Sequence, residues 1–146
     1  MEKSMLLFPR ESGGIKYRAE WVADAVKISK GPKMKPKPGD DFIQRRSAQN
    51  KTVLQYADKT MKRFLNLDHN AYAEGRLPAK SKELLGLVAS LVLRCDDCVK
   101  YHLMQCFDQG VTDDELAETL SIGLIVGGSI TIPHLRRALE FWDNLK

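Results

Sequence analysis

Cys95, Cys98 and His102 lie close together in the second half of this 146-residue chain. The cysteines are three positions apart, and the histidine follows the second cysteine by four positions. On a helix these intervals place all three side chains on one face. A thiol pair that can close a disulfide, with an imidazole in reach of one sulfur, predicts redox chemistry in which a thiolate is the nucleophile.

The surroundings of the cysteines both favour and oppose thiolate formation. A thiol at a helix start meets unpaired backbone N–H groups and the positive end of the helix dipole, which lower its pKa. Asp96 and Asp97 lie between the cysteines, and like-charge repulsion from these carboxylates raises a thiol pKa. A base is therefore needed, and His102 can serve Cys98. Glu83 can orient His102 or accept the proton, provided that its helix folds back against the next. The predicted catalytic residues are Cys98, Cys95, His102 and Glu83.

Other interpretations of this cluster stay open. Two cysteines and a histidine are also three zinc ligands, but a structural zinc site takes four, and His134 would join them only through tertiary folding. The cysteine pair could instead be purely structural. Cys106 is interpreted as a small buried apolar residue, with a third redox thiol as the alternative, and His134 as a capping or packing residue.

The elements around these residues are all predicted to be helices. Apolar residues recur at intervals of three and four, and no strand pattern competes with them, so we expect an all-α fold of about six or seven helices. The expected helices cover residues 17–29, 41–66, 79–93, 96–109, 113–126 and 130–144. The helix over 79–93 is apolar nearly all round, which is typical of a helix that is central to a fold or buried in an oligomer.

Local signals set the ends of several of these helices. Gly110 is a plausible residue to end the helix over 96–109. Thr112 and Glu115 form the pattern of a capping box for the next helix, and Gly127-Gly128 breaks it. Residues 68–75 are expected to form a turn, or one short helical turn, that contains His69.

The N-terminal part differs in composition from the rest. Residues 30–39 carry four lysines and three prolines, and proline forbids a helix interior, so we interpret them as an extended linker. The same lysines could contact nucleic acid, but the run has no aromatic residue on which a base could stack. We therefore divide the chain into an N-terminal extension over 1–40, with its short helix and Lys/Pro linker, and a helical domain over 41–146.

Bulk properties are those of an ordinary soluble domain. The net charge is +4, 43% of residues are apolar and 29% are charged. No apolar run approaches the ~20 residues that span a membrane, and the apolar stretch near Met1 is too short for a secretory signal. Three cysteines argue against a secreted disulfide framework. We expect a cytoplasmic protein that binds neither membranes nor nucleic acid.

The spacing from Glu83 through Cys95-Asp-Asp-Cys98 to His102 resembles the signature of the carboxymuconolactone decarboxylase superfamily, in its AhpD-like alkylhydroperoxidase branch. Residues 110–120, and Gly127-Gly128 with His134, are similar to the rest of that domain. The resemblance covers about residues 45–145. It implies an AhpD-like all-α fold and assembly into homotrimers or homohexamers. It also implies that Cys98 attacks the peroxide, that Cys95 resolves the product, and that His102 and Glu83 relay the proton.

We therefore predict a thiol-dependent hydroperoxidase or disulfide reductase. Its partners would be a small peroxide and a dithiol reductant, and it would need no metal and no organic cofactor. The superfamily's decarboxylases generally lack the cysteine pair. A lyase or isomerase of that type, with acid–base chemistry by His102 and Glu83, is the alternative. A non-enzymatic oligomeric or stress-related partner protein is the third hypothesis.

Overall fold

The computed structural model describes residues 38–146, and this part of the chain is helical and contains no strand. The predicted all-α fold is therefore confirmed. The helix expected over 17–29 and residues 30–37 of the expected linker lie outside the described residues. The linker was predicted to extend to Gly39, but Pro38 and Gly39 already belong to the first helix, since proline is tolerated in a first helical turn. The elements in chain order are α1 (Pro38–Tyr56), α2 (Lys59–Tyr72), α3 (Ala79–Val92), α4 (Asp96–Asp108), α5 (Asp113–Gly127), the short 3-10 helix η2 (Ser129–Thr131) and α6 (Ile132–Asp143).

The single helix predicted over 41–66 is wrong, because the chain breaks between α1 and α2. The Asp58 carboxylate accepts a hydrogen bond of 2.8 Å from the backbone N–H of Met61, so Asp58 is the N-cap of a new helix. The apolar spacing of three and four continues across this break, which is why periodicity alone does not reveal it. α2 also extends to Tyr72, through residues that were predicted to form a turn.

The four later helices begin and end close to their predicted positions. The capping box before α5 is present, since Thr112 Oγ1 accepts from the Glu115 N–H and Glu115 Oε2 accepts from the Thr112 N–H. Gly110 and Gly128 have φ values of +68° and +72°, in the left-handed region that favours glycine. These local signals explain why the predictions for residues 79–144 succeed.

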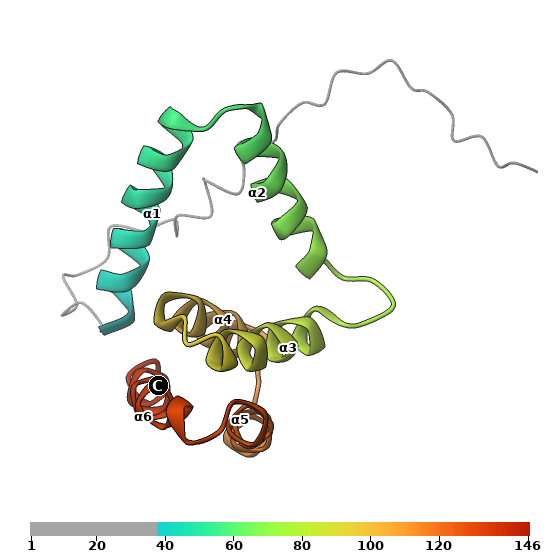
Figure 1. Cartoon of the computed structure of the whole chain (residues 1–146), viewed down its shortest axis with the longest axis vertical. Helices are drawn as coiled ribbons and strands as arrows, with labels where there is room; N and C mark the ends of the chain where they lie inside the picture. Colours follow the sequence, from blue (N-terminus) through green and yellow to red (C-terminus); the bar gives the residue numbers. More distant parts are fainter. Residues whose placement is uncertain (1–37) are drawn as a thin grey trace, which may run out of the picture.

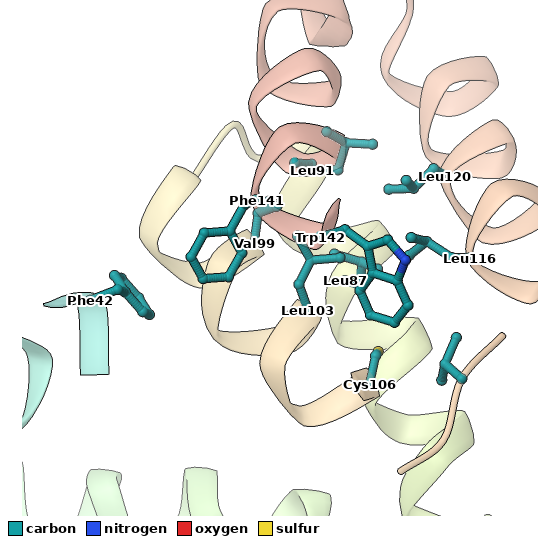
Figure 2. Packing of buried hydrophobic residues seen from close by; sticks show 12 residues of the cluster. Phe42, Leu87, Leu91, Val99, Leu103, Cys106, Leu116, Leu120, Phe141 and Trp142 are labelled. Atoms are coloured by element: carbon teal, nitrogen blue, oxygen red, sulfur yellow. The ribbon is translucent and has the colours of Figure 1, made fainter. Parts of the chain in front are cut away.

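The core lies where α3, α4, α5 and α6 meet (Figure 2). Trp142 is the largest side chain in it, and its indole Nε1 donates a hydrogen bond of 2.7 Å to Asp113 at the start of α5. Burial of each large apolar side chain contributes about 1.5–3 kcal/mol. The fully buried apolar side chains include Leu87, Leu91, Val99, Leu103, Cys106 and Leu116.

α1 and α2 form an arch beside this core (Figure 1). The arch contacts the rest of the domain at its ends. Phe42, in the first turns of α1, packs edge to face against Phe141 of α6, with 5.7 Å between ring centroids. Tyr72, in the last turn of α2, lies against His102 of α4, with 5.1 Å between ring centroids. Among the described residues no helix is both long and apolar enough to cross a bilayer.

Candidate active site

Glu83 and His102 meet between α3 and α4. Their side chains lie 2.7 Å apart, from Glu83 Oε2 to His102 Nδ1, and the residues are only 5% and 6% exposed. α3 packs against α4 along its length, so the helix that carries Glu83 does fold back on the next. The geometric condition that we set for Glu83 is therefore met, whereas its catalytic role stays a prediction.

This hydrogen bond also determines which ring nitrogen of His102 can act as a base. A carboxylate oxygen only accepts, so Nδ1 must carry the hydrogen and donate it to Glu83. In the neutral imidazole the lone pair is then on Nε2, the nitrogen that does not face Glu83. Because His102 follows Cys98 by one helical turn, their Cβ atoms are expected to lie about 5–6 Å apart. His102 Nε2 is therefore the atom that can take up a proton from the thiol.

Gly86 and Tyr72 complete the wall around this imidazole. A Cβ atom added at Gly86 would lie 2.5 Å from His102 Cε1 and 2.8 Å from the Tyr72 hydroxyl oxygen, so no larger residue fits there without moving the site. Burial raises the pKa of Tyr72, with further contributions from Asp68 and Glu83, and keeps it protonated. Neither residue was predicted from the sequence to be part of the site. The only local signal was Gly86 itself, a glycine in the interior of an apolar helix.

The cysteine pair lies at the start of α4 as a Cys95–Cys98 disulfide, with Cα atoms 5.3 Å apart. Both cysteines are half-buried. Cys95 is the N-cap of α4, and its Sγ accepts a hydrogen bond of 3.3 Å from the backbone N–H of Cys98. Once the disulfide is reduced, this position at the positive end of the helix dipole favours thiolate at Cys95.

The two aspartates between the cysteines differ in their surroundings. Asp96 is bound by His134 and Arg137 of α6, whereas Asp97 is exposed and lies 3.6 Å from Arg45 of α1. The repulsion predicted from the two carboxylates is reduced at Asp96, because the packing of α6 against α4 brings a guanidinium to this residue.

Cys106 is fully buried in the core, one helical turn beyond His102. Burial raises its pKa to about 12, with a further increase from Glu83 and a decrease from Lys80. The predicted burial of this residue is confirmed. A thiol that stays protonated at neutral pH is a poor nucleophile.

His134, which we considered as a fourth zinc ligand, is hydrogen-bonded to Asp96. Within residues 38–146, no three histidine, cysteine or acidic side chains are placed so that they could hold a metal ion. The chemistry that this arrangement supports is that of a thiol pair beside a buried acid–base pair.

The chain is similar to several known proteins. The sequence profile of the carboxymuconolactone decarboxylase family matches residues 58–141. An uncharacterized protein of Cupriavidus necator is 34% identical over 85 residues, which cover 58% of this chain and 75% of that protein. An uncharacterized protein from the cox locus of Paracoccus denitrificans is 23% identical over 82 residues, covering 56% and 74% of the two chains.

Solved structures match a longer part of the chain. Two crystal structures of one Thermotoga maritima protein match this chain with TM-scores of 0.71 and 0.69, at 52% and 51% sequence identity. Each match covers 72% of this chain, and the two cover 92% and 89% of the Thermotoga chain. That protein is described as a carboxymuconolactone decarboxylase family protein with a suggested part in antioxidative response. A Legionella pneumophila protein that carries the same family name has a TM-score of 0.66 at 23% identity. The match covers 74% of this chain and 96% of that protein, and at this identity it shows a similar fold only.

Proposed function

Because this chain belongs to the carboxymuconolactone decarboxylase family, we propose that it is a thiol-dependent hydroperoxidase. The observation that carries the proposal is the buried Glu83–His102 pair, one helical turn along α4 from a cysteine pair that can form a disulfide. The suggested antioxidative part of the Thermotoga maritima relative supports the same chemistry. A dithiol reductant is available in a reducing compartment, and we propose the cytoplasm as the location.

In the proposed reaction His102 Nε2 takes the proton of the Cys98 thiol, and the thiolate attacks one oxygen of the peroxide. The O–O bond breaks, Cys98 becomes a sulfenic acid, and the leaving alkoxide takes the proton from His102 to give an alcohol. The Cys95 thiolate then attacks the Cys98 sulfur. The disulfide forms as the S–O bond breaks, and the departing hydroxide takes up a proton from solvent to become water. A dithiol reduces the disulfide by exchange and is itself oxidised.

The two cysteines have different surroundings that suit these two roles. Cys98 shares a helix face with His102, so it is the sulfur that a general base can serve. Cys95 is the N-cap, where the helix terminus stabilises a thiolate without a base. A resolving thiol needs that property, because it must attack as soon as the sulfenic acid forms.

A lyase or isomerase that uses only Glu83 and His102 is the second candidate. The buried carboxylate–imidazole pair at 2.7 Å is competent for acid–base chemistry without any thiol, and the family carries a decarboxylase name. The two candidates differ in one requirement, since only the hydroperoxidase needs a reversible disulfide between Cys95 and Cys98.

Thiol counting tests the proposed function. The fully reduced protein is expected to lose two thiols per chain after treatment with a small alkyl hydroperoxide, and to retain the third. Burial and a pKa of about 12 protect Cys106. Peptide mapping by mass spectrometry should find the bridge between Cys95 and Cys98, and a dithiol should restore both thiols. A bridge that contains Cys106, or no loss of thiols, would refute the hydroperoxidase.

We also propose that the protein assembles into a homotrimer or homohexamer. α2 has no buried residue. Its large apolar side chains Met61, Phe64 and Leu67 are 53%, 68% and 67% exposed. An apolar hollow of about 340 Å³ lies beside them, lined by residues of α1 and α2. An exposed helix face of this kind is typical of an interaction surface.

Light scattering at micromolar concentration is expected to give the mass of a trimer or hexamer. Phe64→Glu should reduce that mass, because a carboxylate cannot be buried unpaired in an apolar interface. Lys59→Glu, a change of charge at an exposed position of the same helix, serves as the control. A monomeric mass for the unmodified protein would contradict the proposal.

A further inference from the structure

Asp96 is held from two sides by α6. Arg137 donates through Nε to Asp96 Oδ2 at 3.0 Å and through its terminal nitrogen to Oδ1 at 3.3 Å. His134 Nδ1 lies 2.7 Å from Oδ1. A guanidinium that reaches both oxygens of one carboxylate forms a strong and directional ion pair. The cluster therefore attaches the residue that directly follows Cys95 to the last helix of the domain.

The His134 ring takes the role of a donor in this cluster. Its Nδ1 also lies 2.9 Å from the Arg137 guanidinium, but one nitrogen cannot donate to a carboxylate and accept from a guanidinium at once. We assign Nδ1–H to Asp96, because the distance to the carboxylate oxygen is shorter and Arg137 has both oxygens as acceptors. Asp96 and Arg137 then contribute one charge each, of opposite sign.

Asp96 stays negatively charged throughout the pH range in which thiols ionise. Burial disfavours its charged form, but hydrogen bonds from His134 and Arg137 outweigh this effect and hold the pKa of the carboxyl below its ordinary value. Asp96 directly follows Cys95, and consecutive Cα atoms are about 3.8 Å apart. Without a counter-charge this carboxylate would oppose thiolate formation at both cysteines.

We propose that Arg137 is a positioning residue for the thiol pair, which neutralises Asp96 and thereby allows Cys95 and Cys98 to ionise near neutral pH. The proposal extends the hydroperoxidase function and rests on it. Arg137 acts through Asp96 and does not itself touch the reacting sulfur atoms in this scheme.

Other charges near the start of α4 do not take over this role. Asp97 and Arg45 make a single contact of 3.6 Å and are more than half exposed. This pair therefore contributes less than the guanidinium contact to both oxygens described above. Glu83 engages His102. Lys100 Nζ lies over two aromatic rings of the core. Arg94 is exposed and forms no ion pair within residues 38–146.

The test is a titration of the reduced protein, in which thiolate formation is followed by ultraviolet absorbance and by the rate of alkylation with iodoacetamide. Arg137→Gln is expected to raise the midpoint pH by about 0.5–1 unit, because Asp96 is left unopposed. Asp96→Asn is expected to lower it by a similar amount, because Arg137 is left unopposed. The double variant should return close to the unmodified protein.

Arg136→Gln is the matched control. It removes the same charge from the neighbouring position of α6, and Arg136 is exposed and forms no ion pair with any residue from 38 to 146. Loss of packing would move both single variants in the same direction, so opposite shifts identify an electrostatic role. Equal shifts for Arg137→Gln and Arg136→Gln, or single variants that shift together, would overturn the proposal. The titration uses no peroxide, so its outcome is independent of whether the protein proves to be a hydroperoxidase.

Discussion

Replacement of Cys98 with serine is expected to abolish dithiol-dependent peroxide consumption, a loss of several orders of magnitude. A serine hydroxyl cannot form a sulfenic acid, and the proposed reaction has no other sulfur served by His102. The measurement is the rate of hydroperoxide loss with several candidate dithiols, compared with the unmodified protein. Cys98→Ser changes one atom at a half-buried position, so the fold should be retained, and the helical circular dichroism signal can verify this.

The other two cysteines supply the controls. Cys95→Ser should still react once with peroxide and then accumulate a sulfenic acid at Cys98, which a dimedone label would detect. Cys106→Ala should retain turnover, because that thiol is buried in the core. If Cys95→Ser, rather than Cys98→Ser, eliminates the sulfenic acid, the two roles are reversed. The N-cap thiolate of Cys95 would then be the attacking group.

Replacement of His102 with alanine is expected to lower the peroxide rate about 10²–10⁴-fold, which is the usual contribution of a general base. It should also move the pH–rate midpoint upward, since the Cys98 thiol must then ionise without an imidazole. Glu83→Gln should act in the same direction but more weakly. A glutamine oxygen can still accept from His102 Nδ1, but it brings no negative charge to stabilise an imidazolium.

His69→Ala is the control for the loss of an imidazole, because His69 is exposed in the last turn of α2 and is hydrogen-bonded to no other side chain of the described region. It should leave both the rate and the pH profile unchanged. A pH–rate profile that stays unmoved in both His102→Ala and Glu83→Gln would eliminate the proton relay. The cysteine pair would then depend on the helix terminus and on Arg137.

The local part of the site could be predicted from the sequence. The intervals from Cys95 to His102 are helical intervals, and the caps around α4 and α5 consist of residues that are adjacent in the chain. The position of Glu83 beside His102 required only that two successive apolar helices pack together. For the same reason the helices from Ala79 onward lie close to their predicted boundaries.

The remaining features depend on tertiary contacts that spacing does not encode. Arg137 and His134 are three positions apart and share a face of α6, but nothing in their spacing identifies Asp96 as their partner. Tyr72 lies in a stretch that was expected to be a turn, so its position over His102 could not be derived. The break at Asp58 depends on a single side-chain cap, which outweighs a continuous apolar pattern.

Gly86 limits how far this domain can be stabilised. A glycine inside a helix costs about 0.5–1 kcal/mol relative to alanine, so Gly→Ala changes are a common route to a more thermostable protein. Here the missing methyl group is the space into which the His102 ring and the Tyr72 hydroxyl fit. A search for heat-resistant variants would therefore meet a trade-off at this position. Alanine at position 86 would strengthen α3, but its methyl group would displace the His102 imidazole.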